Sequence, residues 1–237
     1  MSVRSLCQRI AGTTTESAIP IGATGFYPGI KFRRNGALYG ASSALRIVSP
    51  VDGSPVLVGN LPDLLVGIAF SPDDALYGVS NDGRTLYRID PATGRSLVSV
   101  ALTGTTHASG TAFEGEINGI DFAPDGTLYG IGFSLYTINV NTGVATKISP
   151  TGRQVSGDLY NELDMAADGK LRAATSGTTS NLFVVDQGTG IGQLVGPMGA
   201  TIGGIASRSV IAAFSSETGR DPSVDSNHRH RPIRGDL

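Results

Sequence analysis

The chain is 237 residues long, 40% hydrophobic and 16% charged, with a formal net charge of −2. These values are ordinary for one globular domain with a sizeable core, and they exclude an intrinsically disordered chain. The basic residues are scattered, so there is no basic patch for nucleic acid, and no uncharged run is apolar enough to span a bilayer. The single cysteine, Cys7, forms no internal disulfide, and no signal peptide is visible, so the sequence leaves the location of the protein unassigned.

The first predicted elements are two strands within residues 6–23. The run RIAGTTTESAIPIG at 9–22 corresponds to RIDPATGRSLVSV at 88–100, which forms the second half of a repeated unit. Each run places a polar turn between two short strands. We therefore interpret residues 6–23 as the third and fourth strands of a unit whose first two strands lie elsewhere in the chain.

A unit of roughly 40 residues then recurs along the chain. Its clearest copies begin GIAFSPDDALYG at residues 67–78 and GIDFAPDGTLYG at 119–130. The fourth copy is weaker, and the fifth retains only its first two strands, within residues 203–216. The five copies start at Gly29, Gly67, Gly119, Glu162 and Gly204.

The second copy indicates how each unit is built. Its apolar alternation predicts four short strands, separated by turns that contain Pro-Asp, Asp-Gly and Thr-Gly. Such turn residues tolerate a positive φ or begin a tight turn, so each unit is a run of antiparallel hairpins. The tyrosines that recur in the second strand, Tyr39, Tyr77 and Tyr129, are expected to serve blade packing rather than to form a ligand platform. The predicted strands of the second copy are 67–70, 75–79, 85–90 and 95–100.

Four-stranded antiparallel units repeated in series are typical of a β-propeller, in which each blade buries its faces against its neighbours. We predict an all-β, single-domain propeller over residues 1–216 with five blades. The N-terminal strands, at about 6–23, complete the last blade, at 203–216, and remove the open edge of the ring. The alternative is a truncated piece of a larger propeller. Residues 217–237 are polar and unpatterned, and we predict a disordered tail there.

The units resemble those of bacterial β-propeller repeat proteins that read S-P-D-G-x-L-Y-G and L-Y-x-I-D-x-x-T-G. The resemblance covers residues 6–216 and is carried by GIAFSPDDALYGVS, TLYRIDPATGRSLVSV and LYTINVNTGVATKI. It implies blades rather than a particular chemistry, because the function of such proteins is mostly unassigned and they overlap loosely with NHL-type and quinoprotein-like repeats. The resemblance also implies an exported protein, and here the sequence departs from it because no leader is visible.

The antiparallel order of strands assigns a different set of loops to each face of the propeller. The first-to-second and third-to-fourth turns of every blade share one face, here called the turn face. The loops between second and third strands, and the connections between blades, share the other face, here called the loop face. Its longest segment is ALTGTTHASGTAFEGE at 101–116, which contains three candidate ligand-binding residues, His107, Glu114 and Glu116. Variable loops often carry function, although a long surface loop is also tolerated without any.

The repeat alignment also brings oxygen-bearing side chains together near the axis, because Asn and Asp of the third copy align with Asn and Asp of the fourth. Such oxygens suit Ca²⁺ or another divalent cation, which could act as a Lewis acid on a carbonyl. The alternative is a structural salt bridge, since Lys31 occupies the equivalent position in the first copy. The candidate metal ligands are Asn118, Asp121, Asn161, Glu162 and Asp164.

Two functions from different classes remain. The first is a non-enzymatic binding or interaction module that uses the loop face, because the sequence contains no Ser-His-Asp, Cys-His or phosphate-loop arrangement. Its ligand is expected to be a small molecule, a glycan or a protein, with no assured cofactor, and the chain is expected to be a monomer. The second is a divalent-metal-assisted hydrolase or lactonase that uses the axial carboxylates.

Overall fold

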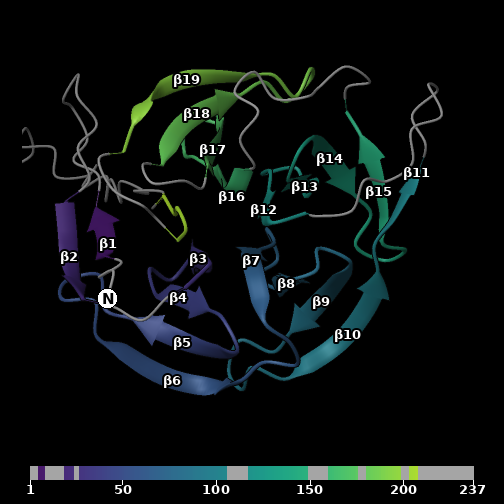
Figure 1. Ribbon diagram of the computed structural model, residues 1–237. Coiled ribbons are helices and arrows are strands. Elements are labelled where there is room, and N and C mark those ends of the chain that lie inside the picture. The colour runs from purple at the N-terminus through teal and green to yellow at the C-terminus, as the bar shows by residue number, and fades with distance from the viewer. Residues whose placement is uncertain are drawn as a thin grey trace, which may run out of the picture.

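The computed structural model describes residues 5–8, 19–23, 27–105, 117–148, 160–175, 180–198 and 203–207. Its regular elements are β-strands, arranged as antiparallel sheets around a common axis (Figure 1). Within these ranges, no helix is long and apolar enough to cross a membrane. The predicted all-β propeller fold is confirmed.

Four of the sheets are blades, numbered one to four along the chain, and the strands of each blade pair in sequence order. Blade one comprises β3 (Gly29–Phe32), β4 (Leu38–Ala41), β5 (Ala44–Val48) and β6 (Pro55–Asn60). Blade two comprises β7 (Leu65–Phe70), β8 (Leu76–Ser80), β9 (Thr85–Ile89) and β10 (Ser96–Ala101). Blade three comprises β12 (Gly119–Phe122), β13 (Leu128–Ile131), β14 (Leu135–Ile138) and β15 (Val144–Lys147). Blade four comprises β16 (Tyr160–Met165), β17 (Leu171–Thr175), β18 (Asn181–Val185) and β19 (Gly192–Pro197).

The first turn of each blade ends on a residue with positive φ. Glycine fills this position in three blades, as Gly36, Gly126 and Gly169. Blade two instead has Asp74, with φ of 68°. The Asp74 carboxylate pairs with Arg33 of blade one, at 2.6 Å between Oδ2 and Nη2. This position therefore carries a side chain that links two adjacent blades, although glycine would adopt the backbone conformation more easily.

The hydrophobic core lies between the blades. The second-strand tyrosine of one blade packs on the first-strand phenylalanine of the next, with ring centroids 5.3 Å apart for Tyr39 and Phe70 and also for Tyr77 and Phe122. Tyr129 packs against the cluster between blades three and four. The predicted role of these tyrosines in blade packing is confirmed.

The outer edges of the blades are protected in two ways. The outermost strands β6, β10 and β19 each contain a β-bulge. β15 has no register shift, and β11 (Thr103–Thr105) covers its outer edge by parallel pairing. Bulges and added strands both hinder edge-to-edge association. β11 was not predicted from the sequence, and it makes blade three the only five-stranded sheet among those described.

Two segments lie between blade four and blade one (Figure 1). β1 (Ser5–Gln8) and β2 (Ile19–Ala23) form an antiparallel pair, as predicted for residues 6–23. Residues 203–207, here called the closing segment, lie near the axis, where Ala206 packs on Ile30 and its buried neighbours. Residues 208–216 and the predicted tail, 217–237, lie outside the described ranges. The closure of a five-bladed ring therefore stays a prediction.

Candidate functional site at the propeller axis

The first strands of the blades surround the axis, and β3, β7, β12 and β16 contact one another in that order. Alternate residues of a strand point to the same side, so the first and third residues of each Gly-Ile-x-Phe unit form two layers along the axis. The glycine layer, nearer the loop face, comprises Gly29, Gly67, Gly119, Glu162 and Gly204. The charged layer comprises Lys31, Ala69, Asp121, Asp164 and Ala206.

The backbones of neighbouring inner strands approach one another closely in the glycine layer. A Cβ atom added to Gly119 would lie 2.5 Å from the Leu163 nitrogen, and one added to Gly67 would lie 2.5 Å from the Asn118 oxygen. Backbone atoms cannot swing aside as a flexible side chain can, so glycine is required for this approach. The other members of this layer are glycines, and Glu162 is the member that has a side chain.

Lys31 lies at the centre of the charged layer. Its Nζ donates hydrogen bonds to Asp121 Oδ2 at 3.1 Å, to Asp164 Oδ1 at 3.1 Å and to the Leu163 carbonyl oxygen at 2.8 Å. The exposed fractions of Lys31, Asp121 and Asp164 are 5%, 6% and 3%. The salt-bridge alternative predicted for Lys31 is confirmed, with both aspartates as partners.

The two aspartates also accept backbone hydrogen bonds in the same way, Asp121 from the strand β16 and Asp164 from the closing segment. Asp121 Oδ2 accepts a hydrogen bond from the Met165 N–H of β16, at 2.6 Å. Asp164 Oδ1 accepts one from the Ser207 N–H of the closing segment, at 3.1 Å. Met165 and Ser207 are the fourth residues of their respective Gly-Ile-x-Phe units. The hydrogen bond between β16 and the closing segment is therefore equivalent to the one between β12 and β16.

Burial and charge act in opposite directions on the ionisable groups of the charged layer. Burial raises the pKa of Asp121 to about 6, although Lys31 opposes this shift. Burial also acts to raise the pKa of Asp164, but Lys31 and the two bonds from Ser207 outweigh it and hold that pKa below its usual value. Burial acts to lower the pKa of Lys31, and the surrounding carboxylates more than compensate, so the pKa is raised. Lys31 therefore stays charged at neutral pH.

Glu162 differs from the two aspartates. Its exposed fraction is 1%, and neither carboxyl oxygen has a hydrogen-bond partner among the described residues. Burial raises the pKa of this carboxyl well above its usual value, and the attraction of Lys31 opposes the shift only in part. An ionised carboxylate without partners is costly in such an environment, which favours the protonated form.

The remaining predicted site residues take no part in the hydrogen bonds of Lys31 or lie outside the described ranges. The half-buried Asn118 donates from Nδ2 to the Tyr160 carbonyl oxygen at 3.4 Å, and Asn161 is also half-buried. Across the described residues, no group of three or more His, Cys, Asp or Glu side chains is arranged to hold a metal ion. The loop candidates His107, Glu114 and Glu116 lie outside these ranges, and their role stays a prediction.

Sequence reasoning missed two groups of the axial cluster. The Leu163 carbonyl is a backbone group, so no residue type could have identified it. Ser207 was visible as a polar residue where the other copies have Phe or Met. That departure from the repeat was the available signal.

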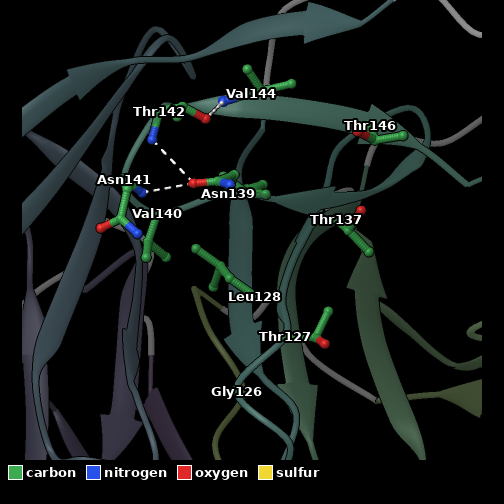
Figure 2. A pocket seen from close by; sticks show the side chains of 11 residues that line it. Gly126, Thr127, Leu128, Thr137, Asn139, Val140, Asn141, Thr142, Val144 and Thr146 are labelled. Carbon is green, nitrogen blue, oxygen red and sulfur yellow. Dashed lines mark hydrogen bonds between the residues drawn. The ribbon is translucent and has the colours of Figure 1, made fainter.

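A shallow hollow of about 610 Å³ lies over blade three, where two turns of the turn face meet (Figure 2). Threonine and asparagine provide its polar lining, and no charged residue contributes to it. The Oδ1 of Asn139 accepts hydrogen bonds from the N–H groups of Asn141 and Thr142, at 3.0 and 3.1 Å, so this side chain stabilises its own turn. The hollow could hydrogen-bond a neutral molecule, but it contains no acid or base for catalysis.

No protein-family model matches this chain, and no curated protein matches it. Among solved structures, the chain is similar to one from a nidogen/laminin complex, with 14% identity, a TM-score of 0.54, and coverage of 87% of this chain and 81% of that one. The chain and this neighbour share the β-propeller fold. At this identity the likeness concerns the fold alone.

Two enzymes also appear among the similar structures. Virginiamycin B lyase from Staphylococcus aureus matches with 18% identity and a TM-score of 0.42, over 70% of this chain and 54% of the lyase. A gluconolactonase from Xanthomonas campestris matches with 14% identity and a TM-score of 0.47, over 70% of this chain and 60% of that protein. The chain thus spans about half the length of the lyase that it matches.

Proposed function

We propose that this chain is a non-enzymatic binding module that takes its ligand on the loop face. The observation that carries this proposal is the set of three hydrogen bonds from Lys31 to Asp121, Asp164 and the Leu163 carbonyl. The axial carboxylates have a cation of their own, and all three side chains are buried. Groups committed in this way hold the blades together and are not available to a substrate without breaking buried ion pairs.

The loop face offers exposed apolar side chains. Leu64, in the connection before β7, has an exposed fraction of 38%, and Phe133, in the turn between β13 and β14, has one of 37%. Thr105, at the end of β11, and Ile117, just before β12, lie on either side of the segment that contains the loop candidates. A contiguous exposed apolar patch marks an interaction site, and the experiment below tests whether Leu64 and Phe133 contribute to one.

The test compares two matched double variants on one array of defined glycans and synthetic peptides. Leu64→Ser with Phe133→Ser alters the loop face, and Leu97→Ser with Val98→Ser alters exposed residues of the outer strand β10. We expect binding of at least one probe to be lost in the first variant and kept in the second. Binding that survives the loop-face changes, or depends on β10, would contradict the proposal.

Metal-assisted hydrolysis is the second candidate, and Glu162 is the observation in its favour. Within the described part of the chain, neither of its carboxyl oxygens has a hydrogen-bond partner, and two further carboxylates lie nearby. Oxygen ligands of this kind suit Ca²⁺ or a similar hard cation. Asp121, Glu162 and Asp164 would have to rearrange around the metal, because no three such side chains are arranged to hold a cation in the described part of the chain. Asn118 and Asn161 are the other predicted ligands, and the metal would act as a Lewis acid.

This second candidate is tested with a simple lactone as substrate. Hydrolysis is measured in the presence of Ca²⁺, Mn²⁺ or Zn²⁺, for the wild type and for Asp121→Asn with Asp164→Asn. A metal-dependent rate that the double variant abolishes would favour the hydrolase. We expect no rate above that of the metal alone.

A further inference from the structure

We propose that Lys31, Asp164 and Ser207 form a clasp that joins blade one, blade four and the closing segment at the axis. The three residues belong to parts of the chain that are far apart in sequence, since Lys31 and Asp164 are separated by 133 positions and Asp164 and Ser207 by 43. The clasp therefore connects the first copy of the repeat with the fourth and the fifth.

The closing segment occupies the place of an inner strand between β16 and β3. A Cβ atom on Gly204 would lie 3.2 Å from Glu162 Oε2 on one side, and 2.7 Å from Ile30 Cγ2 on the other. Ala206 packs against the buried cluster of Tyr27, Ile30, Leu38 and Val48 of blade one. Both neighbours are thus in contact with the segment.

The fourth residue of this segment distinguishes it from the other inner strands. Phe32, Phe70, Phe122 and Met165 occupy this position in blades one to four, and Ser207 occupies it here. Phe70 and Phe122 pack on a tyrosine of the preceding blade. Ser207 instead donates to Asp164 from its Oγ, at 2.5 Å to Oδ2, and from its N–H, at 3.1 Å to Oδ1. In the fifth copy, a polar link thus occupies the position that makes an aromatic contact in blades two and three.

Asp164 makes the clasp a single unit. Its Oδ1 accepts from both Lys31 and Ser207, and its Oδ2 accepts from the Ser207 hydroxyl. Hydrogen bonds to a charged group are stronger than neutral ones, and the buried position of Asp164 excludes competing water. Removing the Ser207 hydroxyl should therefore increase local unfolding of the closing segment first, while blades two and three keep their native structure.

Amide hydrogen exchange of the full chain, followed by mass spectrometry, tests this clasp. Ser207→Ala should speed exchange in residues 203–207 by roughly tenfold or more, with no change in β7. Asp164→Asn should speed exchange in both 203–207 and β3. The matched control is Ser71→Ala, which removes another serine-to-aspartate bond, from Ser71 Oγ to Asp73 Oδ1 at 2.5 Å, in a turn of blade two. This control should leave 203–207 unchanged.

Two results for Ser207→Ala would contradict the clasp. One is an equal increase of exchange in 203–207 and β7 in Ser207→Ala, and the other is no increase in either segment. If Ser207→Ala does not fold, Ser207→Thr replaces it, because threonine keeps the hydroxyl and should give wild-type exchange. Accelerated exchange in the folded threonine variant would also count against the clasp.

Discussion

The charged layer and the glycine layer lie next to each other on the same strands, yet their buried carboxyl groups differ in hydrogen bonding. In the charged layer, Asp121 and Asp164 share the Lys31 ammonium and accept further hydrogen bonds from the next inner strand. In the glycine layer, Glu162 is equally buried, and its oxygens have no hydrogen-bond partner in the ranges that the structure describes. The comparison teaches that partners, rather than depth of burial, decide whether a carboxyl group stabilises this ring.

The comparison predicts the largest loss of stability for Lys31→Met. The substitution keeps most of the side-chain volume but leaves two buried aspartates without their cation, which should cost about 3–5 kcal/mol of unfolding free energy. Urea unfolding measures this loss, and Lys170→Met, at an exposed lysine, should change stability by less than about 0.5 kcal/mol. Adding Asp121→Asn and Asp164→Asn to Lys31→Met should recover much of the loss. Equal stability of Lys31→Met and wild type would break the comparison.

A smaller loss is expected for Gly119→Ala in the glycine layer. The added Cβ would lie 2.5 Å from the Leu163 nitrogen and 2.6 Å from the Glu162 carbonyl carbon, and these backbone atoms cannot move independently of the blade. We expect about 2–3 kcal/mol of destabilisation by overpacking, measured as the urea midpoint. Gly188→Ala is the control, since the nearest atom to its added Cβ is Asp186 Oδ1 at 3.5 Å. A urea midpoint that Gly119→Ala leaves unchanged would show that the inner strands are less tightly packed than described.

The smallest effect is expected for Glu162→Gln, and it depends on pH. Because burial raises the pKa of Glu162 in the folded chain, the folded state binds this proton more tightly than the unfolded state. The stabilisation from this proton is present below the ordinary pKa and is lost as the pH rises through the raised pKa. We expect the variant to gain about 1 kcal/mol on the wild type across this window, or about 2–4 °C in melting temperature. A difference in melting temperature between the variant and the wild type that stays the same at all pH values would contradict this prediction.

Much of the fold and of the axial site could be predicted from the repeat pattern, and the rest depends on contacts between distant segments. Alternation and turn residues predict the strands of blade two, and β7, β8, β9 and β10 lie where expected, within one or two residues at their ends. The alignment also places Lys31 with the aspartates, because equivalent residues of a repeat lie at equivalent depths along the axis.

Local patterns fail where a single contact decides the structure. β11 consists of Thr103–Thr105, which is too short for any alternation, and its partner β15 begins some forty positions later in the chain. Asp74 replaces the usual glycine of its turn, and only the position of Arg33 in space explains it. The sequence also could not predict that Glu162 has no hydrogen-bond partner among the residues described, since the alignment shows which residues share a layer but not which of their atoms meet.

The metal content of the purified protein tests the central claim most directly, which is that Lys31 makes the axial cluster structural. Elemental analysis and a calorimetric titration with Ca²⁺ are carried out on the wild type, on Lys31→Ser and on Asp121→Asn with Asp164→Asn. We predict no stoichiometric metal in the wild type and a melting temperature that a chelator does not change. Removing the ammonium in Lys31→Ser should leave three carboxyl groups able to attract a divalent cation. One tightly bound divalent cation per wild-type chain, lost in the double aspartate variant, would contradict the claim.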